Sequence, residues 1–167
     1  CLKNRFFRIM FVPRQYQSDA VKTAIEWIKK TTEPGLIEAY TAAGKSYIIA
    51  EIARIVSGIS GKKVLVLQPN KELLEQNAEK YRLIGEHCSL FSASANSKSL
   101  RHSVVFGTAL TIKNYLERFG DKFCLVILDE ADASLTPTIL NIIKHLREQN
   151  QKLRVLGLTS SPYKMGY

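Results

Sequence analysis

The chain has 167 residues, of which 46% are apolar and 23% are charged, and this composition fits one globular domain and excludes a disordered tail or a coiled coil. Lys and Arg number 24 against 15 Asp and Glu, so the net charge is +9, which indicates either a polyanionic partner, most simply nucleic acid, or a solvated basic surface. No apolar run approaches the ~20 residues that span a bilayer, so we expect no membrane-spanning segment and no membrane partner.

Short apolar runs alternate with amphipathic stretches along the sequence. Nearly continuous apolar runs are typical of strands buried on both faces of a parallel sheet, whereas apolar residues repeated every three to four positions are typical of helices. In chain order, the predicted elements are a helix at 20–28, a strand at 35–39, a helix at 48–56, a strand at 64–67, a helix at 73–81, strands at 89–91, 104–106 and 123–128, a helix at 139–146 and a strand at 155–158.

This alternation of strands and helices predicts the α/β fold class, with layers around a mainly parallel central sheet and right-handed crossovers. Thr136 and Pro137 are typical of the N-cap and the first residue of a helix, and they precede the last predicted helix. The most polar stretch, residues 92–103, is predicted to be a surface loop. We find no internal repeat and no linker, so the chain is expected to fold as one unit.

A candidate phosphate loop follows the first predicted strand and ends in Gly44-Lys45-Ser46. A loop between a strand and a helix can cradle phosphates with its backbone N–H groups. Gly44 allows close approach of the backbone, Lys45 neutralises phosphate charge, and the Ser46 hydroxyl is suited to ligate Mg²⁺. Alanines at Ala39 and Ala42 depart from the glycine-rich pattern G-x-x-x-x-G-K-S/T, so a plain strand–turn–helix is the alternative interpretation of this segment alone.

A second motif strengthens the nucleotide interpretation. The apolar run 123–128 ends in Asp129-Glu130, and acids at the carboxyl end of a buried strand lie in the ligand crevice of an α/β sheet. Asp129 is predicted to hold Mg²⁺, and Glu130 to orient or deprotonate the attacking water. Lys45, Asp129 and Glu130 are therefore the predicted catalytic residues, and Ser46 and Asp129 the predicted metal ligands.

Together with four further segments, these residues resemble the motifs of superfamily 2 helicases and translocases, of the DEAD/DEAH type, in family order. The resemblance covers most of the chain. The matching segments are Arg14-Gln15-Tyr16-Gln17 (Q-type motif), Thr41-Ala42-Ala43-Gly44-Lys45-Ser46 (motif I), Leu67-Gln68-Pro69-Asn70-Lys71-Glu72-Leu73 (motif Ia), Phe106-Gly107-Thr108 (a nucleic-acid-contacting motif), Asp129-Glu130-Ala131-Asp132 (motif II, spelling DEAD) and Leu158-Thr159-Ser160-Ser161-Pro162 (motif III).

The resemblance implies a three-layer RecA-like P-loop NTPase domain that uses ATP and Mg²⁺. Residues 1–167 would be the single N-terminal RecA-like domain. Motifs IV to VI and their arginine finger, which in the family belong to a second RecA-like domain, have no counterpart here. The residues implied in ATP binding are Arg14, Gln17, Thr41, Ala42, Ala43, Gly44, Lys45 and Ser46. Gln17 would read adenine, with a surface glutamine at a helix start as the alternative, and Arg14 would support the base or pair with a nearby acid.

The resemblance also implies nucleic-acid contacts and a coupling set. Residues implied in binding nucleic acid are Pro69, Asn70, Lys71, Gly107 and Thr108, although helix capping is the alternative for Asn70 and Thr108. Residues implied in coupling the phosphate state to domain movement are Asp132, Thr159 and Ser161.

The function expected from this resemblance is that of an ATP-dependent DNA helicase or translocase. The Arg-x-Tyr-Gln, Gly-Lys-Ser and Phe-Gly-Thr features are closer to RadD-like, restriction-translocase-like and phage UvsW-like DNA enzymes than to the RNA-directed DEAD-box group. Two alternatives stay open: an RNA helicase of the same superfamily, and a nucleotide-gated nucleic-acid-binding module without turnover.

Cysteine and histidine usage points to no zinc site. The three cysteines are an odd number without metal-type spacing, and no histidine clusters with a cysteine pair. A disulfide framework is therefore not expected, and a reducing cytoplasm is the expected compartment.

Overall fold

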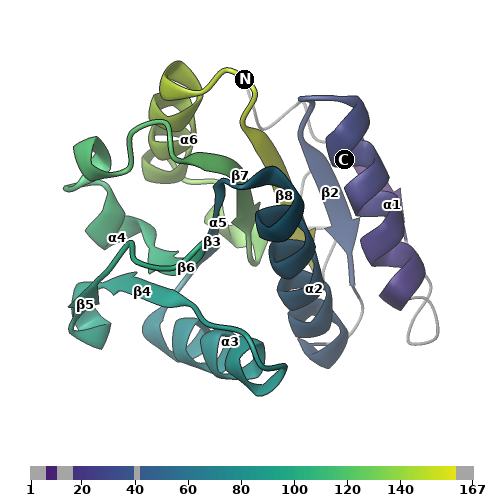
Figure 1. The fold of residues 1–167 in the computed structure, drawn as a ribbon, viewed down its shortest axis with the longest axis horizontal. Coiled ribbons are helices and arrows are strands. Elements are labelled where there is room, and N and C mark those ends of the chain that lie inside the picture. Colours follow the sequence, from purple (N-terminus) through teal and green to yellow (C-terminus); the bar gives the residue numbers. More distant parts are fainter. Residues whose placement is uncertain (1–6, 11–16, 40–41, 161–167) are drawn as a thin grey trace.

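The computed structural model describes residues 7–10, 17–39 and 42–160, and its centre is one twisted sheet (Figure 1). The strands lie in the order β1-β2-β8-β7-β3-β6-β4-β5, and every neighbouring pair is parallel except β4 and β5. The strands are β1 (Phe7–Met10), β2 (Gly35–Glu38), β3 (Lys63–Gln68), β4 (Ser89–Ser92), β5 (Ser97–Lys98), β6 (Val104–Thr108), β7 (Phe123–Leu128) and β8 (Arg154–Thr159).

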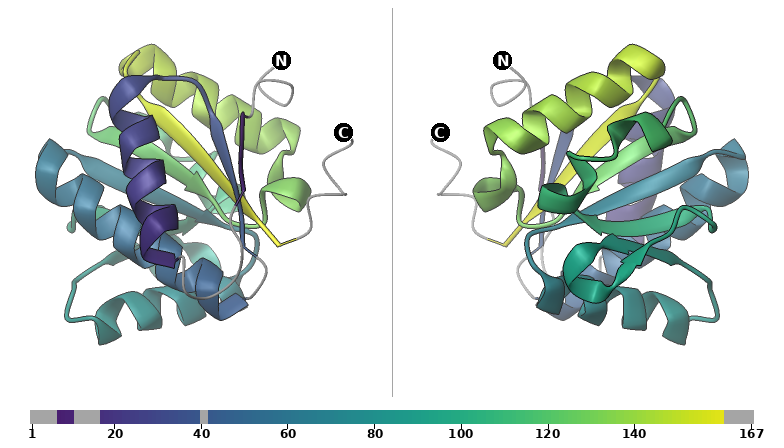
Figure 2. Two further views of the ribbon diagram at one scale, coloured as in Figure 1. Left: turned by 90° about the vertical axis from the view of Figure 1, so that its right-hand side faces the viewer. Right: turned by 90° about the vertical axis from the view of Figure 1, so that its left-hand side faces the viewer.

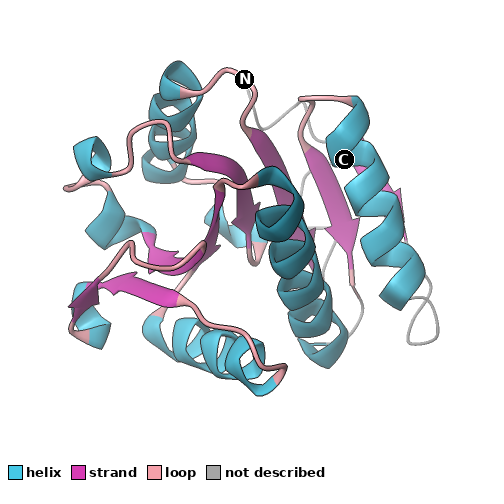
Figure 3. Cartoon of the chain, in the orientation of Figure 1, coloured by secondary structure: helices cyan, strands magenta, loops and turns pink. Residues whose placement is uncertain are grey.

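Helices cover both faces of the sheet, which gives three layers (Figures 2 and 3). One face is covered by α1 (Gln17–Lys30), α2 (Ala42–Ser60) and α3 (Lys71–Leu83). The other is covered by α4 (Ala109–Ile112), η3 (Leu116–Arg118) and α6 (Pro137–Gln149). The short α5 (Ala131–Ser134) follows β7, and η2 (Ala93–Ala95) follows β4. None of the helices in the described ranges is both long and apolar enough to cross a membrane.

Strand β3 shows why the predicted strands are apolar at nearly every position. Val64 and Val66 pack into the cluster under α1, α2 and α3, whereas Leu65 and Leu67 pack into the cluster under α4 and α6. Since alternate side chains point to opposite faces, a strand covered on both sides needs apolar residues throughout.

The six predicted strands and four predicted helices are confirmed, with ends that differ by a few residues. The predicted start of the last helix is also confirmed. Thr136 is the N-cap of α6, its hydroxyl accepts a hydrogen bond from the Ile139 N–H at 3.3 Å, and Pro137 occupies the first turn.

The prediction of a surface loop at 92–103 is wrong in part. Ser92 is the buried end of β4, and the chain then forms η2 and returns as β5, antiparallel to β4. Asn96 makes the turn with a φ of 52°, in the left-handed region that asparagine tolerates better than most residues. The sequence does not predict this hairpin, because its strands are short and paired through backbone hydrogen bonds, and its polar side chains show no apolar strand pattern. Strand β1 was not predicted either.

Candidate nucleotide site and nucleic-acid face

The candidate nucleotide site lies at the carboxyl edge of the sheet. Strands β2 and β7 flank β8, so the loop after β2 and the acids after β7 reach the same edge from either side of β8. Crevices at this edge are where open parallel sheets bind ligands. Lys45 and Ser46 stand in the first turn and a half of α2, and Asp129 and Glu130 directly follow β7.

Lys45 is the centre of this site. Its ammonium forms an ion pair with Asp129, with Nζ 3.0 Å from Oδ1, and a second ion pair with Glu130 Oε1. The side chain of Lys45 is 5% exposed and that of Asp129 is fully buried. Lys45 is more than 80 positions away from Asp129 and Glu130 in the sequence. The fold nevertheless brings these three predicted catalytic residues into direct contact.

Electrostatics keep Lys45 charged. Burial acts to lower the pKa of Lys45, but the charge of Asp129 and the hydrogen bonds to both carboxylates outweigh it and raise that pKa above its ordinary value. Burial raises the pKa of Asp129, and the neighbouring Lys45 ammonium offsets only part of this effect. Lys45 therefore carries a positive charge at neutral pH and holds two carboxyl groups beside it.

The turn after β7 has an unusual backbone. Glu130 has a φ of 52°, in the left-handed region that L-residues rarely adopt. The turn is held by the Glu130 N–H, which donates to Asp129 Oδ1 at 2.9 Å, and by the Ser134 hydroxyl, which donates to the Asp129 carbonyl at 2.8 Å. Backbone strain of this kind concentrates at functional sites, where surrounding contacts maintain it.

The oxygen atoms predicted to hold Mg²⁺ are brought together. Ser46 Oγ donates to Asn77 Oδ1 at 2.8 Å, and Asn77 Nδ2 donates to Asp129 Oδ2 at 3.0 Å, so one amide links both predicted ligands. A hydroxyl and a carboxylate are hard oxygen donors of the kind that Mg²⁺ prefers. The described ranges contain no group of three His, Cys, Asp or Glu side chains suited to a metal, but Mg²⁺ sites completed by substrate phosphates need only one or two protein ligands.

A cavity of about 740 Å³ opens beside the nucleotide site, over the ends of β3 and β6 and the segment from α5 into α6. Three of the five residues predicted to bind nucleic acid, Pro69, Asn70 and Thr108, line it. The Asn70 side chain also caps α3, since its Oδ1 accepts from the Leu73 N–H at 2.9 Å. The alternative interpretation of Asn70 as a helix cap is thus confirmed.

The other predicted nucleic-acid residues differ in exposure. Lys71 is an exposed lysine in the first turn of α3, with its Nζ 3.8 Å from Glu75 Oε1. Gly107 is buried in β6, where an added Cβ would lie 2.6 Å from Ile112 Cδ1 and 3.0 Å from the Phe91 carbonyl oxygen. Glycine is required at position 107 by close packing.

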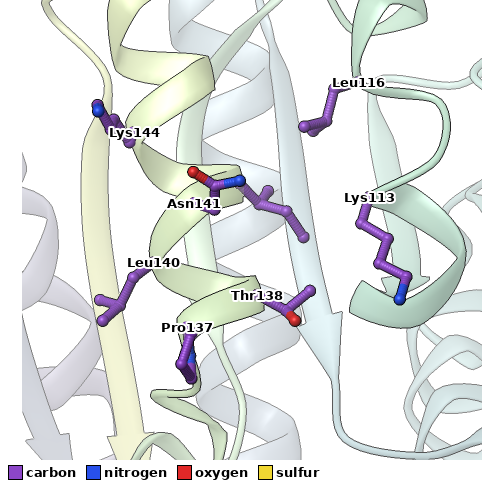
Figure 4. Close-up of a pocket in the computed structure, with 8 residues that line it drawn as sticks. Lys113, Leu116, Pro137, Thr138, Leu140, Asn141 and Lys144 are labelled. Atoms are coloured by element: carbon purple, nitrogen blue, oxygen red, sulfur yellow. The ribbon is translucent and has the colours of Figure 1, made fainter.

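A second pocket, of about 590 Å³, lies between α6 and the α4–η3 segment (Figure 4). Lys113 and Lys144 stand on opposite sides of it. Thr138 lines both this pocket and the 740 Å³ cavity, so the two hollows adjoin at the start of α6.

The sequence of residues 10–164 matches the family model described as "Type III restriction enzyme, res subunit". The chain belongs to this family. No curated protein matches the chain significantly. Solved structures do: the UvsW helicase from bacteriophage T4 (25% identity, 94% of this chain and 57% of that chain, TM-score 0.70) and the Hef helicase domain of Pyrococcus furiosus (27% identity, 92% of this chain and 34% of that chain, TM-score 0.71).

A nuclease-deletion mutant of the Type ISP restriction-modification enzyme LlaGI, solved with a DNA substrate mimic, shares the fold at 18% identity and a TM-score of 0.63, over 91% of this chain and 18% of that one. The present chain thus spans less than two thirds of each of these proteins. The predicted RecA-like fold is confirmed by these likenesses to helicase structures.

Several predicted residues of this domain lie outside the described ranges, namely Arg14, Thr41 and Ser161. The first turn of α2 contains Ala42 and Ala43, and Gln17 is the first residue of α1. Asp132 lies in α5, which packs against β8, the strand that ends at Thr159. The Oδ1 atom of Asp132 is buried without a hydrogen-bond partner among the described residues.

Three polar residues around the candidate nucleotide site, Asn77, Gln68 and Lys80, were assigned no role from the sequence. Asn77 lies with Leu74, Ala78 and Tyr81 on the buried face of the helix that the sequence predicts at 73–81, and a polar residue on such a face is a signal of a specific partner. Gln68 accepts from Asn77 Nδ2 at 3.2 Å, and Lys80 Nζ donates to Ser46 Oγ at 3.3 Å. The hydrogen bonds of these residues join different helices and strands, so residue spacing along the sequence does not predict these contacts.

Proposed function

We propose that this chain is the N-terminal RecA-like domain of an ATP-dependent DNA helicase or translocase, acting with a second RecA-like domain in a reducing cytoplasm. The observation that carries the proposal is the contact of Lys45 with Asp129 and Glu130 at the carboxyl edge of the sheet. Membership of the res-subunit family and the likeness to the UvsW and Hef helicases support it.

In this proposal the charged residues exchange partners when ATP binds. The Lys45 ammonium turns from the carboxylates to the β- and γ-phosphates, whose negatively charged oxygens replace the carboxylate oxygens as its partners. Asp129 and Ser46 would hold Mg²⁺ in that state, and the ion would supply charge neutralisation at the phosphates. Glu130, 30% exposed, orients the attacking water, and Gln17 and Arg14 hold the adenine.

We propose that nucleic acid lies over the 740 Å³ cavity, which Pro69, Asn70 and Thr108 line. Lys71 is next to Asn70 in the sequence, and Gly107 is buried in β6 beside Thr108. The net charge of +9 supports a polyanionic partner. DNA is favoured over RNA because LlaGI, which shares the fold, was solved with a DNA substrate mimic.

Movement is proposed to follow the phosphate state through a small set of residues. Asp132 and Thr159, with Ser161, would carry the change toward the second domain. The packing of α5 against β8 supports this route for the first two residues.

Nucleotide titrations of Lys45→Ala test the proposal. Loss of the ammonium removes a phosphate contact, so ATP·Mg²⁺ affinity should fall at least about tenfold, which corresponds to ~1.4 kcal/mol. Lys71→Ala is the matched control, because Lys71 is an ion-paired lysine on α3 outside the nucleotide site. Equal ATP affinity in Lys45→Ala and the wild type would overturn the assignment of the site.

A further inference from the structure

Asn77 is a buried amide whose side-chain hydrogen bonds run to Ser46 and Asp129 of the candidate nucleotide site and to Gln68. It is 4% exposed, on the face of α3 that packs against the sheet. Its Oδ1 accepts from Ser46 Oγ at 2.8 Å, and its Nδ2 donates to Asp129 Oδ2 at 3.0 Å and to Gln68 Oε1 at 3.2 Å. The amide therefore spans the gap between α2, β3 and the end of β7.

The chemistry of the partners fixes the orientation of this amide. An ionised carboxylate can only accept hydrogen bonds, so the NH₂ group of Asn77 has to face Asp129. The carbonyl oxygen of Asn77 then faces Ser46, and the serine hydroxyl has to donate its proton to it. Because the Ser46 hydroxyl proton points toward Asn77, the lone pairs of the Ser46 oxygen point elsewhere and are oriented to coordinate a cation. A Mg²⁺ ligand requires this orientation.

We propose that Asn77 is a positioning residue that orients Ser46 and Asp129 for Mg²⁺, with Gln68 bracing the amide from β3. This inference rests on the proposed nucleotide-binding function and adds a residue of α3 to the phosphate-loop and acidic motifs. Groups that orient metal ligands through hydrogen bonds typically contribute 10–100-fold to metal affinity.

Packing alone does not account for an asparagine at this position. Its neighbours on the same face of α3, Leu74, Ala78 and Tyr81, are buried core residues, and a leucine at 77 would fill a similar volume without burying polar atoms. A leucine would also leave Asp129 Oδ2 without the hydrogen bond from Asn77 Nδ2. Among uncharged side chains, an amide is suited to accept from a hydroxyl while donating to a carboxylate.

The experiment compares Asn77→Leu with Gln76→Leu, the same substitution at the exposed neighbouring position of α3. ADP binding is measured by calorimetry on the intact chain, once with Mn²⁺ as the probe for Mg²⁺ and once with EDTA. We expect Asn77→Leu to weaken Mn²⁺·ADP binding about 10–100-fold while metal-free ADP affinity stays unchanged. Gln76→Leu should leave both affinities unchanged.

Thermal unfolding separates positioning from folding. A purely structural role would lower the melting temperature and affect both ADP affinities equally, and that result would overturn the inference. If Asn77→Leu does not fold, Asn77→Ala takes its place, because alanine cannot clash and favours the helix. A wild-type chain that binds no ADP would overturn the proposed function and this inference with it, whereas an unchanged Mn²⁺·ADP affinity in Asn77→Leu would overturn the inference alone.

Discussion

At the residue scale, Lys45 contributes to the stability of the fold and to the proposed binding of nucleotide, and the two contributions are measured separately. Its ammonium is buried between Asp129 and Glu130, so it stabilises the fold without nucleotide. The same charge is the proposed phosphate contact. Exchange of carboxylate for phosphate keeps the buried cation paired throughout, which avoids the large cost of an isolated buried charge.

We expect Lys45→Ala to lower the free energy of unfolding at pH 7 by about 3–5 kcal/mol, because removal of one partner leaves the buried Asp129 carboxylate without its counter-charge. The variant should still fold if the whole domain has ordinary stability. Lys71→Ala is the control, since its ion pair with Glu75 is exposed and should contribute less than about 1 kcal/mol. Urea unfolding of the three proteins measures both values, and equal losses in the two variants would contradict the buried pair.

The stability cost of Lys45→Ala should shrink at acidic pH. Burial already raises the pKa of Asp129, and Lys45 opposes that rise, so its removal raises the Asp129 pKa further. An acid whose folded-state pKa exceeds its unfolded value takes up protons on folding, and its unfavourable contribution declines as pH falls through the folded pKa. The difference between variant and wild type should therefore be smaller at pH 5 than at pH 7 in the same urea experiment.

At the scale of elements, β6 and α4 meet at Gly107. An added methyl group at Gly107 would lie 3.0 Å from the Phe91 carbonyl of β4, which is backbone and cannot turn aside. We expect Gly107→Ala to destabilise the chain by about 1–3 kcal/mol. Gly58, in α2, has open space at the same position, so Gly58→Ala should be neutral or stabilising by up to ~1 kcal/mol. Thermal unfolding of both variants measures these effects. An unchanged melting temperature in Gly107→Ala would show that β6 and α4 pack less closely than the structure indicates.

How far the sequence predicts these elements depends on how each is stabilised. Strands covered on both faces were predicted, because burial imposes apolar residues at every position. Strand β5 was not, since it is two polar residues held by pairing with β4. The candidate nucleotide site was predicted through Lys45 and Asp129, which belong to the proposed phosphate-binding and Mg²⁺-binding motifs. Asn77 was not, because it lies 31 residues from Ser46 and 52 from Asp129, and only the fold brings them together.

At the scale of the whole molecule, the net charge of +9 and the cavity above β3 and β6 lead us to expect nucleic-acid binding that is weak, indifferent to base sequence and steeply salt-dependent. For single strands, the logarithm of the binding constant should fall with that of the salt concentration by about 0.7 per phosphate contacted. Fluorescence anisotropy with DNA oligonucleotides of two unrelated sequences, and with matched RNA, measures this slope. Affinity that persists unchanged from low to high salt would exclude binding through phosphates.

ATP turnover by this chain alone should be negligible, even with DNA present. Among related phosphoryl-transfer enzymes, an arginine that stabilises the γ-phosphoryl charge contributes on the order of 10³–10⁵ in kcat. The resemblance assigns that arginine to motif VI of a second RecA-like domain, whereas the last motif matched within residues 1–167 is motif III. Glu130 can orient water, but a positioned water does not replace the missing electrostatic stabilisation. Phosphate release is measured with and without single-stranded and branched DNA, using Glu130→Gln as the background. DNA-stimulated turnover well above that background would show that the chain completes its own site, for instance by self-association, and that a second domain is not needed for the chemistry.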